Sequence, residues 1–70
     1  MLSEEEEIEK LKEIAITSGL VEVRKKCIDA LAAYGEKAIP AILEVVEHSS
    51  IVEVRTHGLE TVKKLKEKRT

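Results

Sequence analysis

Few side chains in this 70-residue chain are of the types that catalyse reactions or bind metals. The only histidines are His48 and His57, and Glu44 precedes His48 by four residues, on the same face of an expected helix. A metal site needs three or four converging ligands, and the chain has neither a Cys-x-x-Cys nor a His-Glu-x-x-His motif. The sequence therefore favours histidines exposed to solvent near helix ends, and we expect no metal and no cofactor.

The nucleophilic side chains are also explained without catalysis. Cys27 would need a partner base and a positive field to be reactive, but it falls on an apolar helical stripe beside Ala30 and Leu31, which favours a small buried side chain. The glycines are isolated, so no phosphate-binding loop is expected. The serines occur at expected helix ends, where they cap helices: Ser3, Ser18, Ser49 and Ser50. We expect a protein that is not an enzyme.

The elements that position these residues repeat along the chain. Val21-Glu22-Val23-Arg24 recurs as Val52-Glu53-Val54-Arg55, with a start 31 residues later. The same offset also places apolar residues on apolar residues over most of the chain, for example Ile8 on Ile39. A fixed period of this size indicates one supersecondary unit laid down twice.

Four amphipathic helices are expected in a single domain of residues 1–70, at about 4–17, 20–34, 36–48 and 51–68. Nothing alternates with period two, so no strand is expected, and connections of two or three residues make consecutive helices antiparallel. The expected apolar stripes are Ile8, Leu11, Ile14 and Ala15; Leu20, Val23, Cys27, Ile28, Ala30, Leu31 and Tyr34; Ile39, Ile42, Leu43 and Val46; and Ile51, Val54, Leu59, Val62 and Leu65.

Several residues at helix ends and one within a helix carry local signals. Gly35 follows the second helix where a left-handed C-cap is expected. Gly58, inside the last helix, stands 31 residues after Cys27, and a small residue at both positions predicts a closely approaching neighbour helix. Two Ser-x-x-Glu pairs have capping-box spacing, Ser3 with Glu6 and Ser50 with Glu53.

Composition restricts the class of protein. Charged residues make up 37% of the chain and hydrophobic ones 43%, with Tyr34 the only aromatic and no Asn or Gln. Abundant Glu and Lys without thermolabile amides is typical of thermophilic proteins. One cysteine fits a reducing cytoplasm, the acidic start differs from a signal peptide, and no apolar run is long enough to span a membrane. We expect a cytoplasmic protein.

Charge is distributed unevenly. Residues 1–19 contain six Glu and two Lys, and residues 61–70 contain five bases and one Glu. These opposed ends either complement the helix dipoles or steer head-to-tail association. The basic end could contact phosphates, but its residues surround the helix, the net charge is −2 and Tyr34 is the only aromatic side chain available for stacking, so nucleic acid is not the expected partner. The basic residues are Lys63, Lys64, Lys66, Lys68 and Arg69.

The sequence resembles HEAT-like repeats, in particular the short PBS-lyase-type repeats, over roughly residues 7–66. The resemblance rests on Val23-Arg24 and Val54-Arg55, on Ile28-Asp29-Ala30-Leu31, on Tyr34-Gly35-Glu36-Lys37-Ala38-Ile39-Pro40, and on Leu43 beyond it. It implies an all-α fold of about two repeats in right-handed superhelical stacking. The family usually has an acidic residue before the Val-Arg pair, whereas these turns contain serine. Arg24 and Arg55 are therefore expected to bond to helix-end carbonyls or to Glu22 and Glu53.

The resemblance also suggests where partners bind. About three repeats are normally needed for stability, so the four helices either close into a bundle or stack on another copy, and we expect a homodimer. The surplus apolar residues for self-association are Ile16, Leu20, Val45 and Ile51. The polar face that lines the concave side of HEAT solenoids would contain Lys10, Glu13, Thr17, Ala41, Glu44 and His48.

These observations predict a non-catalytic protein–protein interaction or self-assembling scaffold module of HEAT type, with no membrane association. Two alternatives remain open at this point. One is a nucleic-acid-associated protein that uses the basic final helix. The other is an accessory docking subunit of a larger enzyme.

Overall fold

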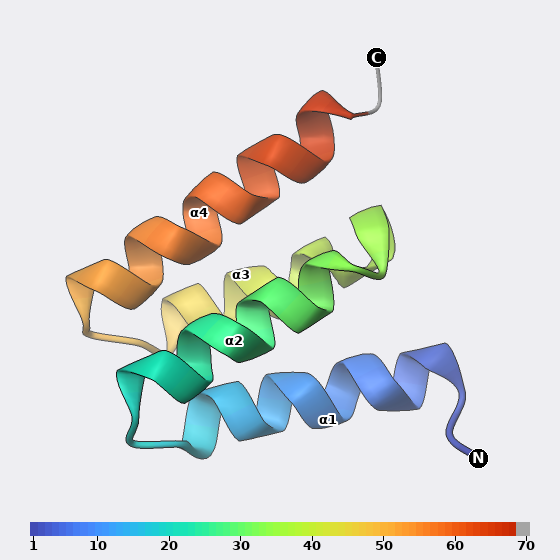
Figure 1. Ribbon diagram of the computed structural model, residues 1–70, viewed down its shortest axis with the longest axis horizontal. Helices are drawn as coiled ribbons and strands as arrows, with labels where there is room; N and C mark the ends of the chain where they lie inside the picture. Colours follow the sequence, from blue (N-terminus) through green and yellow to red (C-terminus); the bar gives the residue numbers. More distant parts are fainter. Residues whose placement is uncertain (69–70) are drawn as a thin grey trace.

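The computed structural model describes residues 1–68, which form four α-helices joined by short connections and contain no strand (Figure 1). Consecutive helices run antiparallel, with α1 and α4 outermost and α2 and α3 between them (Figure 1). The elements are α1 (Glu4–Thr17), α2 (Val21–Ala32), the 3-10 helix η1 (Gly35–Ala38), α3 (Ile39–Glu47) and α4 (Val52–Glu67). The expected all-α class with four antiparallel helices is confirmed.

The ends of α1 and α4 differ although both were expected to carry a capping box. At α1, the Ser3 hydroxyl accepts a hydrogen bond from the Glu6 N–H at 3.2 Å, and the Glu6 carboxylate accepts one from the Ser3 N–H at 3.0 Å. The box expected at Ser50 and Glu53 is wrong. The N-cap of α4 is Ile51, which places Ser50 one residue too early for its hydroxyl to cap the helix.

The connection between α2 and α3 also departs from expectation. Helix α2 ends at Ala32, and the chain turns through Gly35, whose φ of 77° is the left-handed conformation predicted for it. Residues 35–38 then form η1 rather than the first turn of an α-helix. As a result α3 begins at Ile39, and Pro40 lies in its first turn, where its missing N–H costs little.

The helices pack as two antiparallel hairpins that stack on each other. Helix α1 packs along α2 (hairpin 1) and α3 along α4 (hairpin 2), while α2–α4 and α1–α3 contacts join the hairpins. A single apolar core fills the space between the hairpins. Its largest fully buried side chains are Ile28, Leu31, Ile42, Val45 and Val54.

Small residues permit the close packing within the hairpins. A Cβ atom at Gly58 would lie 2.4 Å from Cγ2 of Val46, so α3 and α4 approach so closely that a Cβ there would displace the Val46 side chain. The predicted close approach at this glycine is confirmed. Its counterpart Cys27 is buried as expected, and burial raises the pKa of the thiol because the charged thiolate is disfavoured away from water.

Candidate interaction surfaces

Arg24 is the main polar link between the two hairpins. Its Nε donates a hydrogen bond to the carbonyl of Ser18 at 2.7 Å, as expected for an arginine bound to a helix end, because Ser18 is the C-cap of α1. Its Nη1 donates to the hydroxyl of Ser49 at 3.2 Å. The same hydroxyl accepts from the N–H of Ile51 at 3.3 Å. Arg24 therefore ties the turn before α2 to the turn before α4.

Polar pairs extend this link along the rim of the hairpin interface. In two of the pairs the lysine lowers the pKa of its carboxylate partner, because the ammonium group stabilises the charged form: this holds for Glu44 beside Lys12 and for Glu53 beside Lys25. The pairs that join the hairpins are Lys12–Glu44 at 2.8 Å, Lys25–Glu53 at 2.7 Å and Asp29–His57 at 2.7 Å.

Residues related by the 31-residue offset differ systematically in exposure. Ile28 is 0% exposed because it faces hairpin 2, whereas its counterpart Leu59 is 50% exposed. The reverse holds for Val45, which faces hairpin 1 and is 1% exposed, whereas its counterpart Ile14 is 48% exposed. The outer side of hairpin 2 thus repeats the inner side of hairpin 1, and the outer side of hairpin 1 repeats the inner side of hairpin 2.

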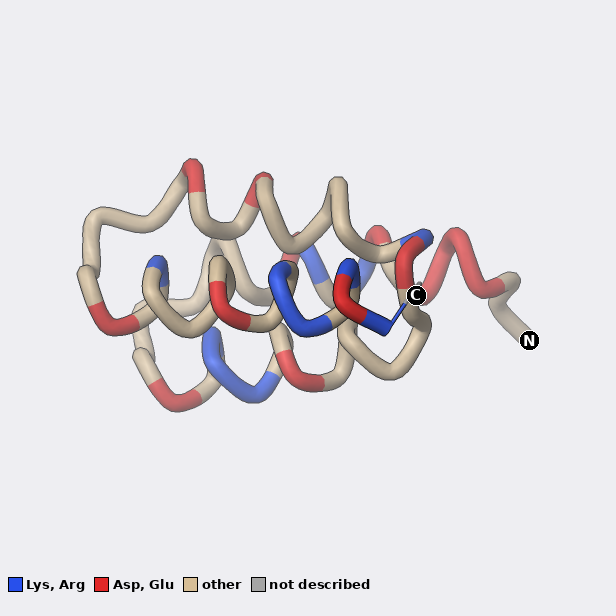
Figure 2. Tube along the Cα trace, turned by 90° about the horizontal axis from the view of Figure 1, so that it is seen from above, with Lys and Arg blue, Asp and Glu red and all other residues tan. Residues whose placement is uncertain are grey.

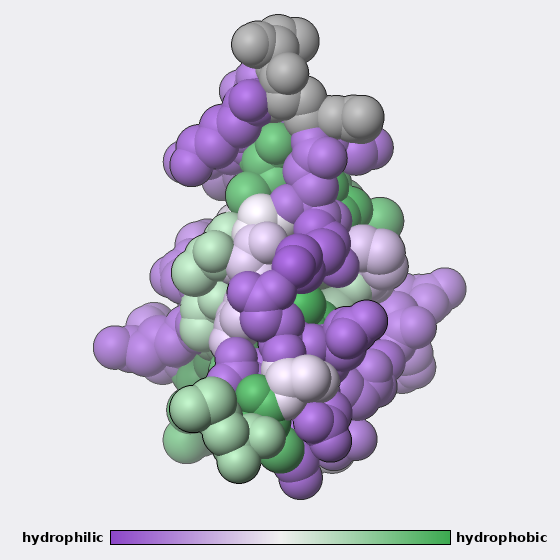
Figure 3. All heavy atoms as spheres, turned by 90° about the vertical axis from the view of Figure 1, so that its right-hand side faces the viewer, coloured by the Kyte–Doolittle hydropathy of each residue, from purple (hydrophilic) through white to green (hydrophobic). Residues whose placement is uncertain are grey.

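These two outer sides are the candidate interaction surfaces. We define the N-face, on hairpin 1, as the exposed Ile14 and Leu20 together with Val23, which is partly buried against the core. The C-face, on hairpin 2, is Leu43, Val52, Arg55 and Leu59. Apart from the first two residues, every large exposed hydrophobic side chain among the described residues belongs to one of the two faces. Figure 3 views the end of the molecule where α4 ends: green, hydrophobic atoms gather near the top, beside α4, and at the bottom, near the start of the chain.

Arg55 of the C-face differs from its counterpart Arg24. Within residues 1–68 its side chain makes no hydrogen bond or ion pair, so the expected bond to a helix-end carbonyl or to Glu53 is not formed. Arg55 lies on the surface stripe of α4 that also contains Val52 and Leu59. Arg55 therefore has the repeat position of Arg24, but within residues 1–68 no second hairpin packs against its side of hairpin 2 to provide the partner that Ser49 provides for Arg24.

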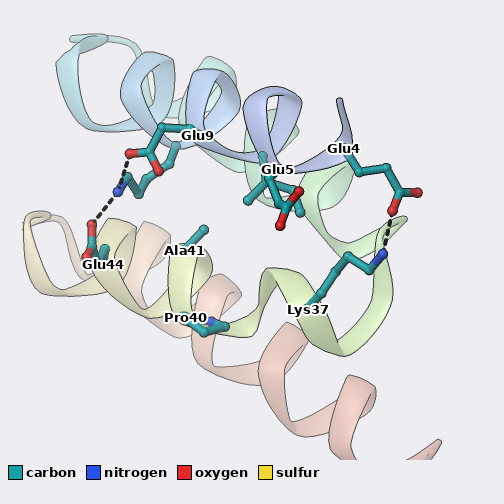
Figure 4. A pocket seen from close by; sticks show the side chains of 9 residues that line it. Glu4, Glu5, Glu9, Lys37, Pro40, Ala41 and Glu44 are labelled. Carbon is teal, nitrogen blue, oxygen red and sulfur yellow. Dashed lines mark hydrogen bonds and ion pairs between the residues drawn. The ribbon is translucent and has the colours of Figure 1, made fainter. Parts of the chain in front are cut away.

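A polar groove of about 590 Å³ separates α1 from η1 and α3 (Figure 4). At one end Lys37 pairs with Glu4, and at the other Lys12 bridges Glu9 and Glu44 (Figure 4). Both lysines of the groove are therefore neutralised by carboxylates of the groove itself. This leaves no unbalanced cation to attract an anionic ligand.

The polar face predicted from the sequence is only partly present. Lys10, Glu13 and Thr17 are exposed on α1, and Glu44 and His48 are exposed on α3. Two of these side chains bond to their own helix: the Thr17 hydroxyl donates to the Glu13 carbonyl, and the His48 ring contacts the Glu44 carbonyl. Ala41 is buried at the base of the groove, so its assignment to the surface was wrong.

Some of the residues predicted for self-association are exposed and others are buried. Leu20 is exposed and belongs to the N-face, whereas Ile16 and Ile51 are partly buried against the core. Val45 is fully buried between the hairpins, so its assignment as a surplus apolar residue was wrong. Conversely, five residues assigned to the expected apolar stripes are exposed, because no helix covers that side of their hairpin or helix: Ile14, Leu20, Ala30, Leu43 and Leu59. Val52, also exposed, was predicted as part of the repeat motif but not for self-association.

Other kinds of site find no support in the described part of the chain. Residues 1–68 contain no group of three or more His, Cys, Asp or Glu side chains placed to hold a metal ion. None of the described helices has the length and apolar character needed to cross a lipid bilayer. The basic residues Lys63, Lys64 and Lys66 lie on α4, and Arg69 lies outside the described residues. Comparison with family models, curated proteins and solved structures finds no significant match.

Proposed function

We propose that the protein is a non-catalytic, HEAT-like interaction module whose partner is a second copy of the same chain. The N-face and the C-face are the contact surfaces, and the smallest assembly is a homodimer. One observation carries this proposal: the exposed apolar residues Leu59 and Ile14 occupy positions whose repeat counterparts, Ile28 and Val45, are fully buried. Each face therefore has the side chains of an interface but nothing covering them.

The proposed contact is weak and reversible. Burial of apolar surface stabilises an interface by about 25 cal/mol per Å². Association must also offset the loss of translational and rotational freedom, roughly 4–15 kcal/mol. Because each face exposes only two or three large apolar side chains, the net affinity is modest and the degree of association depends on protein concentration.

Dilution of isotope-labelled protein, followed by amide chemical shifts, tests the proposal residue by residue. The expected result is that shifts change with concentration at Ile14, Leu20, Val52 and Leu59 and not on the polar face of α1, for which Lys10 is the internal control. Spectra that do not change from micromolar to millimolar concentration would contradict self-association. Shift changes confined to the polar face of α1 would place the interface there and contradict the assignment of the N-face and the C-face.

A further inference from the structure

We propose that the copies join head to tail, with the C-face of one against the N-face of the next, in the register that hairpin 2 adopts on hairpin 1. This inference rests on the proposed self-association and specifies its geometry. The N-face and the C-face are the two halves of one interface, which the chain already forms once within itself. The partner that fits each face is therefore the opposite face of another copy.

The apolar positions support this register. Continuing the 31-residue offset across two copies places Leu59 where Ile28 lies in the internal interface. Val23 and Ile14 of the next copy take the places of the fully buried Val54 and Val45. All of these residues are aliphatic, so the contact between copies preserves the apolar character of the internal one.

The polar contacts also have counterparts between copies. The bond from Arg24 to Ser49 becomes a bond from Arg55 to Ser18 of the next copy, which gives Arg55 the partner that it lacks within residues 1–68. The pair of Asp29 with His57 becomes Glu60 with Lys26 of the next copy, again acid with base.

Two internal ion pairs have no counterpart between copies. The pair of Lys25 with Glu53 becomes Thr56 with Glu22 of the next copy. The pair of Lys12 with Glu44 becomes Leu43 with Glu13 of the next copy. No like charges meet at these places. The contact between copies is therefore compatible with the internal interface but weaker, in agreement with reversible association.

The ends of the outer helices add a second complementarity. The 31-residue offset relates the end of α2 to a position in α4, and α4 continues for four residues beyond that position. The same offset relates the start of α3 to a position in α1, and α1 begins four residues before that position. Because α2 and α3 are neighbours within the chain, head-to-tail stacking places these two extra turns side by side. The turn of α4 contains Lys64 and Lys66 beside Glu67. The turn of α1 is Glu4–Glu7, in which Glu4 already pairs with Lys37 and Glu7 accepts a hydrogen bond from Tyr34 (Figure 2).

Head-to-tail contact has a distinctive consequence. The two contacting surfaces are different, so each contact leaves one N-face and one C-face uncovered for further copies. Such heterologous association continues into chains or rings. An association through two identical faces would instead close at the dimer.

Two blocked variants distinguish these geometries. Ile14→Glu with Leu20→Glu disables the N-face, and Leu59→Glu disables the C-face; all three positions are exposed, and circular dichroism verifies that the variants remain helical. Each variant alone is expected to be a monomer, whereas an equimolar mixture forms dimers with one copy of each. A blocked variant that dimerises alone would overturn the inference.

The wild-type chain, measured in parallel, separates the two levels of the proposal. If wild type associates but the mixture remains monomeric, the head-to-tail geometry is wrong and self-association stands. If wild type remains monomeric, self-association itself fails, and the geometry fails with it.

Charge reversal provides a second, independent test of the register. Glu60→Lys and Lys26→Glu are each expected to weaken association of the full chain by about two- to five-fold, the effect of one exposed ion pair. The two substitutions combined in one chain restore the pair and the original affinity. Absence of this rescue would overturn the register of Glu60 with Lys26.

Discussion

Single residues determine how closely the helices approach, and Gly58 is the clearest case. Helix propensity alone favours alanine over glycine in the middle of α4 by about 1 kcal/mol. The Cβ of an alanine would nevertheless lie 2.4 Å from Cγ2 of Val46, whose branched side chain has little rotamer freedom in a helix. The steric requirement therefore outweighs the propensity.

Gly58→Ala is accordingly expected to lower the free energy of unfolding by up to about 2 kcal/mol, since overpacking costs about 1–3 kcal/mol and propensity offsets about 1 kcal/mol. In a Val46→Ala background the clash is removed and the same substitution becomes stabilising. Denaturant unfolding of the four variants measures this reversal of sign. Gly19→Ala is the matched control, because an added Cβ there has nothing within 4 Å.

Sequence predicts those residue roles that depend on the local chain. The cap at Ser3, the left-handed Gly35 and the buried Cys27 follow from spacing to near neighbours in sequence, and all three are confirmed. The failed assignments at Ser50 and Arg55 have a different cause. A shift of one residue in the helix start removes the first role. For Arg55, the local counterpart of the Arg24 bond to the Ser18 carbonyl would be a bond to the Ser49 carbonyl, and it is not formed within residues 1–68.

At the scale of elements, Arg24 and Arg55 form a matched pair that measures the link between hairpins. Arg24→Met is expected to lower the free energy of unfolding by about 1–3 kcal/mol, because the hydrogen bonds from Arg24 to the Ser18 carbonyl and to the Ser49 hydroxyl are lost. Arg55→Met is expected to change it by less than about 0.5 kcal/mol. Denaturant unfolding in the Leu59→Glu background, which is designed to block the proposed association, provides the comparison. Equal losses at both positions would contradict the assigned link.

The ion pairs across the hairpins predict a dependence of stability on pH. Lysines lower the pKa of Glu44 and Glu53 from 4.5, so their contribution is fully present above that value and is lost as the pH falls through the lowered pKa. We expect the free energy of unfolding to decrease below about pH 4.5. Glu44→Gln with Glu53→Gln should flatten this dependence, as followed by denaturant unfolding at several pH values.

The control for this experiment is Glu47→Gln. Glu47 is exposed and makes no ion pair within residues 1–68. Its replacement should leave the acid limb of the stability profile unchanged. A profile that Glu47→Gln flattens as much as the double variant would show that general charge, rather than the two hairpin pairs, sets the pH dependence.

At the scale of the whole molecule, periodicity predicts four helices but not which of their sides are covered. Ile14, Leu43 and Leu59 have the helical spacing of core residues, and in each case the next or preceding repeat would cover them. Their exposure depends on how many hairpins stack and in which order. For the same reason Val45, which looked surplus in a single helix, is buried between two. The N-face and the C-face can therefore be identified only when the positions of the two hairpins relative to each other are known.

The most direct test of self-association through these faces is the mass of the wild-type chain from micromolar to millimolar concentration, by light scattering after size exclusion. The account predicts a mass that starts at one chain, rises with concentration and passes the dimer without a plateau. A mass of one chain at every concentration would contradict it.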